Sequence, residues 1–138
     1  MDAAEIERLI RQGLPQADQN DFRVDEVGAG YALARQPFLP QLVRPGGTLS
    51  GPTMMALADG AMYAAVLAAL GGEQMAVTQN LNFQFLAKPQ AADLYARARI
   101  LKQGQRTIFL EVMLFQQDES EPVAHASGCY AIPVTRSL

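Results

Sequence analysis

One acidic residue, Asp59, stands in the most apolar segment of the chain, GGTLSGPTMMALADGAMYAAVLAALGG (residues 46–72). On a helix, its neighbours one turn away would all be uncharged: Met55, Ala56, Met62 and Tyr63. A carboxylate that is buried without partners is costly. Two interpretations follow. Either the helix bends outward and Asp59 meets water or accepts local hydrogen bonds, or Asp59 faces a pocket and acts as a general base or nucleophile.

The start of the same segment could stabilise a developing negative charge. Ser50 is a reasonable helix N-cap, Pro52 suits the first turn, and Gly51 lets another group approach the backbone closely. Free N–H groups and the helix dipole favour an oxyanion there. Gly51 and Asp59 are separated by roughly 12 Å along a helix, at about 1.5 Å per residue. The acid would therefore have to come from another subunit, or the substrate would have to span the gap.

The elements that position these groups are visible in the hydrophobic pattern. Residues 1–15 predict an N-terminal helix that ends at a glycine and a proline, and residues 22–37 predict two short strands. Residues 36–47 contain three prolines and two glycines and predict a loop. The central helix is expected over residues 48–70, ending at Gly71-Gly72.

The rest of the chain, residues 77–132, alternates between apolar and polar residues and predicts four antiparallel strands. In the first of these strands, strict alternation places Val77 on the same face as Leu81, Phe83 and Phe85, with Thr78 on the opposite face. A helix that is apolar all round needs cover on every side, so we expect a single sheet curled around it and a partner subunit beyond. The fold class is therefore α+β.

The composition narrows the function classes. A net charge of −3 without a basic tract argues against nucleic acid or an acidic membrane surface as a partner. Asp59 and Gly60 interrupt the apolar run, which argues against a membrane span. The single cysteine, Cys129, fits a reducing cytosol, and residues 1–13 lack the apolar region of a signal peptide. One cysteine and one histidine, His125, cannot form a standard zinc site, so no metal is expected.

The chain from about Arg44 to Ile132 resembles the hotdog-fold acyl-CoA thioesterases, specifically the phenylacetyl-CoA type. The matching segments are GGTLSGPTMMALADGAM, VTQNLNFQFLAKP, GQRTIFLEV and VAHASGCYAIP. In that family a curved antiparallel sheet wraps a long helix, protomers pair through their sheets, and dimers often pair again. The resemblance implies a single hotdog domain over residues 1–138 that forms a homodimer or homotetramer.

The resemblance also implies roles for individual residues. Asp59 falls on the family's catalytic carboxylate, and Gly51 falls on the glycine whose backbone N–H polarises the thioester carbonyl. In the family these groups come from different subunits. The roughly 12 Å between Gly51 and Asp59 along one helix would then not prevent them from acting together. Further substrate contacts are expected at Arg44, Ser50, Met55, Met62, Tyr63 and Thr78. Lys88 and Arg106 resemble basic residues near the nucleotide end of coenzyme A, although solvated surface charge would also explain them.

The chain departs from the family pattern at three places. Ser50-Gly51-Pro52 stands where the family usually has His-Gly-Gly, so the histidine is missing and the residue after Gly51 has no N–H. Arg44 stands where the family tends to carry Asn or Gln, and Tyr63 stands where related enzymes can have Ser or Thr.

We expect a cytoplasmic enzyme that hydrolyses an acyl-CoA or related thioester, with no cofactor beyond the coenzyme A of its substrate. Asp59 would activate water or attack the acyl carbon, while the Gly51 N–H holds the oxyanion. One alternative is a non-catalytic hotdog protein that binds acyl thioesters or another apolar anion. A further alternative is hydration or dehydration of an acyl thioester, which usually requires a histidine paired with the acid.

Overall fold

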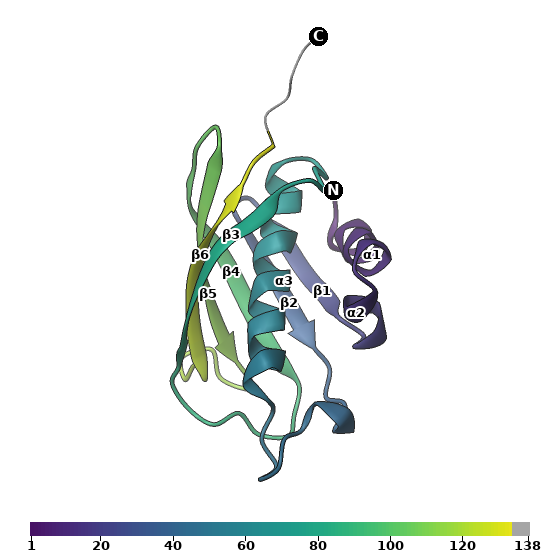
Figure 1. Cartoon of the computed structure of the whole chain (residues 1–138), viewed down its shortest axis with the longest axis vertical. Coiled ribbons are helices and arrows are strands. Elements are labelled where there is room, and N and C mark those ends of the chain that lie inside the picture. Colours follow the sequence, from purple (N-terminus) through teal and green to yellow (C-terminus); the bar gives the residue numbers. More distant parts are fainter. Residues whose placement is uncertain (134–138) are drawn as a thin grey trace.

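A long central helix lies against one face of a curved antiparallel sheet, as Figure 1 shows for this computed structural model, which describes residues 1–133. The predicted α+β class is therefore confirmed. The helices are α1 (Ala3–Gly13), α2 (Pro15–Gln19) and α3 (Gly51–Ala69), with a 3-10 turn at Pro40–Leu42. The strands are β1 (Arg23–Gly28), β2 (Tyr31–Gln36), β3 (Val77–Phe85), β4 (Leu94–Gln103), β5 (Thr107–Phe115) and β6 (Ala124–Ala131).

The six strands are arranged in the order β1-β2-β4-β5-β6-β3. The β3 strand therefore pairs with β6 and lies at one edge of the sheet, although β4 follows it in the chain. The α2 helix was not predicted from the sequence. Pro15 ends α1 but also suits the first position of the new helix, where its missing N–H costs no hydrogen bond.

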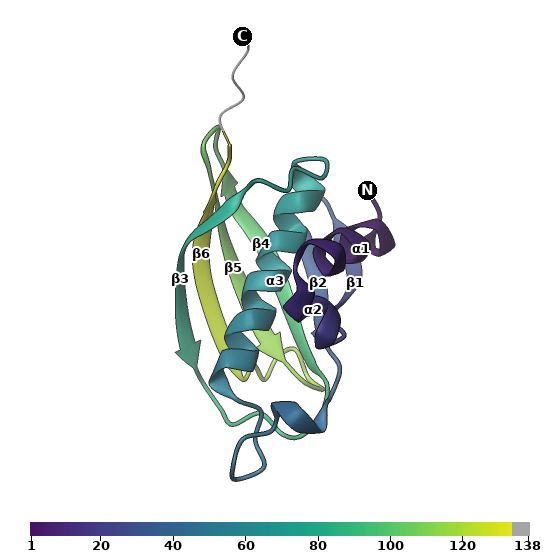
Figure 2. The same ribbon diagram turned by 45° about the vertical axis from the view of Figure 1, so that its right-hand side comes forward.

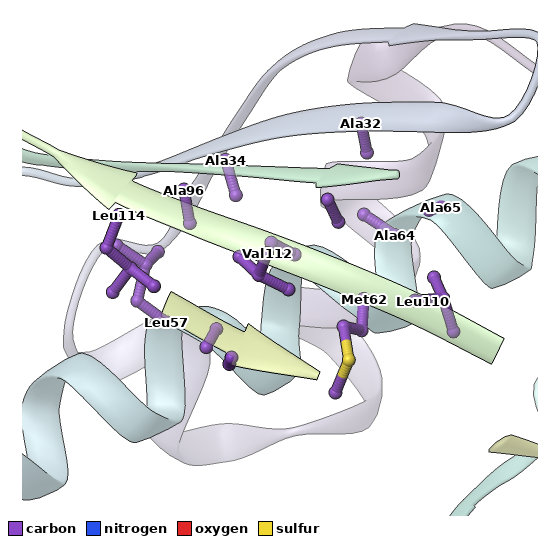
Figure 3. Close-up of a cluster of buried hydrophobic side chains, with 14 of the residues drawn as sticks. Ala32, Ala34, Leu57, Met62, Ala64, Ala65, Ala96, Leu110, Val112 and Leu114 are labelled. Atoms are coloured by element: carbon purple, nitrogen blue, oxygen red, sulfur yellow. The ribbon is translucent and has the colours of Figure 1, made fainter. Parts of the chain in front are cut away.

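The core lies between α3 and the sheet, and small side chains let the two approach closely. Ala58, Ala61 and Ala65 of α3 are fully buried, and the facing residues of β2 and β4 are also alanines. Larger side chains from α3 and β5 fill the remaining space, including Leu57, Met62, Leu110, Val112 and Leu114 (Figure 3). Burying one such side chain contributes about 1.5–3 kcal/mol.

The two N-terminal helices lie beside α3 and cover one flank of it (Figure 2). Ile6 and Ile10 of α1 are buried against the core, which confirms the helical spacing seen in the sequence. The Glu7 carboxylate accepts a hydrogen bond from the Val24 backbone N–H at 2.9 Å, and Arg11 pairs with Asp21. These contacts fix α1 to the start of β1 and thereby build one wall beside α3.

The first turn of β3 differs from the strict alternation expected from the sequence. A β-bulge between Thr78 and Asn80 shifts the register against β6. Beyond the bulge Leu81 packs on the core, and Thr78 also points to the helix side, where it hydrogen-bonds Asp59. The prediction that Thr78 lies on the face opposite Leu81 was therefore wrong, because one extra residue reverses the alternation.

The bulge needs a glycine on the neighbouring strand. A Cβ atom at Gly128 of β6 would lie 2.4 Å from the backbone oxygen of Asn80. Only a residue without a side chain lets the two strands come this close. Gly128 therefore belongs with the bulge that orients Thr78.

The α3 helix has the length and apolar composition of a membrane-crossing helix, and half of its most apolar window is buried inside the protein. The core helix of a soluble protein has the same two properties, so length and composition alone do not separate the two cases.

Candidate active site

A cavity of about 480 Å³ lies over α3, between the two N-terminal helices and the start of β3. Its lining is mostly apolar, with several amides and hydroxyls, and Asp59 is the only charged residue among the described residues that line it. The lining comprises Ile10, Leu14, Gln16, Ala17, Asn20, Phe22, Gln36, Ala56, Leu57, Asp59, Gly60, Tyr63, Gln74, Ala76, Val77, Thr78 and Tyr130.

Two hydroxyl groups hold the Asp59 carboxylate in this cavity. Thr78 Oγ1 and Tyr130 OH each donate a hydrogen bond to Asp59 Oδ1 at 2.8 Å. Thr78 and Tyr130 are direct partners in the β3–β6 ladder, so both side chains leave the sheet at the same height and reach the same oxygen. Among residues 1–133, Asp59 Oδ2 receives no hydrogen bond and the carboxylate forms no ion pair.

The Tyr130 hydroxyl remains neutral throughout the ordinary pH range. Burial of the side chain and the nearby charge of Asp59 both raise the pKa of Tyr130. The hydroxyl therefore stays a donor to the carboxylate. It also lies 3.1 Å from the Asp59 backbone oxygen, so Tyr130 joins β6 to the helix at this residue.

Tyr63 forms part of the cavity wall next to the acid. Its ring stacks against the Tyr130 ring with centroids 6.0 Å apart, and its hydroxyl donates to the Gln74 backbone oxygen at 3.0 Å. Burial, with a smaller contribution from Glu73, raises the pKa of Tyr63. The Tyr63 ring is thus held in place as part of the cavity lining, and its hydroxyl is already hydrogen-bonded to the Gln74 backbone.

The start of α3 is capped as the sequence predicts. Ser50 Oγ accepts a hydrogen bond from the Thr53 backbone N–H at 3.3 Å and pairs with Thr53 Oγ1 at 2.8 Å. Within residues 1–133 the Gly51 N–H has no acceptor. The Phe85 ring lies close above this turn, since a Cβ atom at Gly51 would be 3.3 Å from Phe85 Cζ.

The predicted site residues do not all gather at the cavity. Asp59, Tyr63 and Thr78 line it, and Gly51 and Ser50 lie at the start of the same helix. Met62 is 0% exposed and packs in the core against the sheet, so it cannot touch a substrate in the cavity (Figure 3). Met55 is exposed on α3 outside the cavity lining.

The predicted basic residues also lie outside the cavity. Arg44 is exposed in the loop before α3. Lys88 follows the end of β3 at Phe85, which pairs with Ala124, whereas the Arg106 backbone oxygen bonds Ile132 beyond the other end of β6. Lys88 and Arg106 of one protomer are therefore at opposite ends of the sheet and cannot bind the same nucleotide.

Sequence reasoning missed several residues of the site. No local signal in the sequence identifies Tyr130 as a partner of an acid 71 positions earlier. Gly60 is needed because a Cβ atom there would lie 2.6 Å from the Phe22 ring, which forms part of the cavity floor. Gln36, the one buried polar residue of the described core, lies where the predicted strands (residues 22–37) and the predicted loop (residues 36–47) overlap, so the sequence does not indicate that it is buried.

No metal site accompanies these groups in the described part of the chain, where no three His, Cys, Asp or Glu side chains cluster. His125, on the outer face of the sheet, instead bonds Glu111 at 3.1 Å. The arrangement at the cavity is one half-buried carboxylate with an open oxygen, two neutral donors and a mostly apolar lining. It suits activation of water or attack on an acyl carbon.

The family model of the thioesterase superfamily matches residues 46–123, which include the cavity acid and the start of α3. The chain belongs to the thioesterase superfamily. The match covers more than half of the chain and supports thioester hydrolysis as the class of reaction. A comparison with curated proteins gives no match.

Solved structures agree with the family. A candidate thioesterase from Silicibacter sp. TM1040 is 37% identical, covers 97% of this chain and 93% of its own, and superposes with a TM-score of 0.87. The hotdog fold implied by the resemblance is thereby confirmed. A phenylacetic acid degradation-related protein from Ralstonia eutropha JMP134 shares the fold at 24% identity and a TM-score of 0.80, covering 92% of this chain and 98% of its own.

A mutant of the phenylacetic acid degradation protein PaaI from Thermus thermophilus also shares the fold. It is 21% identical, covers 85% of this chain and 97% of its own, and has a TM-score of 0.75.

Proposed function

We propose that this thioesterase-superfamily protein hydrolyses an acyl-CoA or a related acyl thioester, with Asp59 as the reacting carboxylate. The observation that carries the proposal is the state of Asp59. It is the only charged residue of the cavity lining in residues 1–133, and neutral hydroxyls hold one of its oxygens while the other is open. A carboxylate paired with a cation would be a weaker base and nucleophile.

Two mechanisms use this carboxylate. In the first, Asp59 takes a proton from water, the water oxygen bonds the acyl carbon, the carbon–sulfur bond breaks, and the proton passes from Asp59 to the leaving thiolate, which gives the thiol and the free acid. In the second, Asp59 attacks the acyl carbon, the thiolate leaves and takes up a proton, and water then hydrolyses the acyl anhydride. Thr78 and Tyr130 hold the carboxylate in place in both cases.

The thioester oxygen would be held by the Gly51 N–H of a second protomer. This proposal is supported by the lack of an acceptor for that N–H among residues 1–133 and by the separation of Gly51 and Asp59 along one helix. The backbone of Ser50 and Pro52 supplies no further donor, because the Ser50 N–H bonds the Leu42 oxygen and proline has no N–H. We therefore infer a single backbone donor for the developing oxyanion.

Pairing of two protomers is supported by the edge of the sheet. The β3 edge strand and its flanks carry large exposed side chains, among them Met75, Val77, Phe85 and Leu86. An exposed apolar edge strand readily pairs with a second chain. In a dimer or tetramer, Lys88 and Arg106 could reach one coenzyme A only if they come from different protomers. No cofactor beyond that coenzyme A is required, and we propose a cytoplasmic location.

A second candidate is an acyl-thioester-binding protein without catalysis. It is favoured by the Ser50-Gly51-Pro52 sequence, which leaves one N–H where a Gly-Gly pair would offer two. The exposed Arg44 guanidinium near the same helix start could bind a carboxylate or another anion.

Thiol release from short, long and aryl acyl-CoAs, measured for the wild type and for Asp59→Asn, separates the two candidates. We expect turnover of at least one substrate, and a fall in kcat of about 10²–10⁴ in the variant, as for loss of a general base. Asp25→Asn is the matched control, since Asp25 pairs with Arg35 outside the cavity. Tight binding without turnover would favour the binding protein, and full activity of Asp59→Asn would contradict the site.

A further inference from the structure

One amide in the cavity lining, that of Gln36, offers a hydrogen-bond acceptor that the proposed reaction does not use. Gln36, the last residue of β2, lines the cavity and is 6% exposed. Its Nε2 donates to the backbone oxygens of Asn20 at 2.6 Å and Pro37 at 2.9 Å. Only the nitrogen end of an amide can donate to two carbonyls, so these bonds fix its orientation.

The oxygen of the same amide, Gln36 Oε1, is therefore available to accept a hydrogen bond from a ligand. Among residues 1–133 no donor reaches Gln36 Oε1. No side-chain nitrogen or oxygen in this part of the chain is both fully buried and without a partner, so Oε1 keeps some accessible surface. Gln36 is a lining residue of the cavity, and we assign this accessible surface to it.

The cavity that Gln36 lines is mostly apolar and also contains Asp59, although the amides of Gln16, Asn20 and Gln74 belong to its lining. Phe22 and Leu57 line the cavity with Gln36, and Phe22 packs against the bare backbone of Gly60. Asp59 lines the same cavity. An acyl group whose carbonyl lies at Asp59 thus has a mostly apolar path, with Gln36 Oε1 as an acceptor on its wall.

We propose that Gln36 is a specificity-determining residue and that the preferred substrate is a hydroxylated acyl thioester. A hydroxyl on the far part of the acyl group donates to Gln36 Oε1 while the rest of the group contacts the apolar walls. An unsubstituted chain of the same length leaves this oxygen facing carbon, stripped of water, which costs binding free energy. This inference rests on the proposed function, because it assumes that the acyl group occupies the cavity.

The test compares matched pairs of acyl-CoAs, from short to medium length, each pair consisting of an unsubstituted chain and its terminally hydroxylated counterpart. For the chain length that reaches Gln36, we expect a kcat/KM about threefold to tenfold higher for the hydroxylated member, as for one net hydrogen bond. In Gln36→Met, which keeps the length of the side chain, that ratio should fall to about one. Gln19→Met is the control, since Gln19 is exposed on α2 outside the cavity.

A purely structural role of Gln36 would lower the stability of the variant without changing the ratio between the two substrates. Equal kcat/KM values for every pair in the wild type, or a preference that survives Gln36→Met, would overturn the inference. If no thioester is hydrolysed, the same pairs are tested as non-hydrolysable thioether analogues by calorimetry. A hydroxyl preference in Kd that Gln36→Met removes would then support Gln36 although hydrolysis fails, and equal Kd values would overturn it.

Discussion

At the scale of single residues, the carboxylates of Asp59 and Glu111 have opposite kinds of hydrogen-bond partners. Asp59 receives its hydrogen bonds from the neutral hydroxyls of Thr78 and Tyr130. Glu111, on the outer face of the sheet, lies between Arg99 and His125, which lower its pKa. A base or nucleophile must keep its lone pairs available, so the environment of Asp59 suits chemistry and that of Glu111 suits stability.

The proposed oxyanion donor can be removed without removing a side chain. Gly51→Pro deletes the Gly51 N–H, and proline suits the first position of a helix. Ser50 is already extended, at φ −75° and ψ 153°, as a residue before proline must be. We expect kcat for thioester hydrolysis to fall by about 10²–10³, as for loss of one oxyanion donor.

Gly51→Ala is the matched control for this variant, because its new Cβ meets the same Phe85 ring at 3.3 Å but the N–H remains. It should retain most of the activity. An equal loss of kcat in the two variants would point to the contact with Phe85 and would contradict the role of the N–H.

At the scale of elements, the β3 bulge and its glycine determine where Thr78 points. Gly128→Ala would place a Cβ atom 2.4 Å from the Asn80 oxygen, so β3 must move away from β6. We expect the free energy of unfolding, measured by urea denaturation, to fall by about 1–3 kcal/mol, as for overpacking in a core. Thioester hydrolysis should fall as well, because Thr78 moves relative to Asp59.

Gly13→Ala is the control for this substitution. Its Cβ would have only the Gln74 Oε1 atom nearby, at 3.9 Å, so its stability should equal or exceed that of the wild type. A Gly128→Ala variant with unchanged stability would show that the two strands can separate without cost, against the role given to the bulge.

The three strands β4, β5 and β6 are joined on their outer face by Arg99, Glu111 and His125. Arg99 and His125 lower the pKa of Glu111 below its ordinary value of 4.5. The ionised Glu111 carboxylate therefore stabilises the fold above that pH. The contribution is lost as the pH falls through the lowered pKa.

Glu111→Gln should therefore be less stable than the wild type at neutral pH, by about 1 kcal/mol or less for such exposed pairs. The difference in the free energy of unfolding between the two proteins should shrink as the pH falls below about 4.5, the ordinary pKa of a glutamate, toward the lower pKa of Glu111 in the folded protein. Urea denaturation at several pH values measures it. A difference that stays constant down to strongly acidic pH would contradict the assignment.

The elements themselves were largely predictable, and the site only in part. Hydrophobic periodicity predicts the central helix and the four later strands nearly to their observed bounds. The bulge at Thr78 was not predictable, because one extra residue in a strand leaves no mark on composition. Tyr130 and Gln36 escaped for a related reason, since their roles depend on partners that are distant in the chain.

At the scale of the whole molecule, the protomer leaves part of its central helix and one sheet edge uncovered. The sheet covers one side of α3 and the N-terminal helices cover a flank (Figures 1 and 2). Met55 remains 39% exposed and Phe85 52% exposed. The cavity with Asp59 opens beside this uncovered helix. A second protomer paired along β3 would cover the helix and bring another Gly51 toward Asp59.

The central claim is that each active site combines Asp59 of one protomer with Gly51 of another. Mixed dimers of Asp59→Asn and Gly51→Pro protomers test it most directly. Each variant alone has both sites damaged, whereas a hybrid dimer has one site with both groups intact. Random pairing makes half of the dimers hybrids, so we predict that about a quarter of the wild-type activity returns on mixing. No return of activity, in a mixture where hybrid dimers are shown to form, would contradict the shared site.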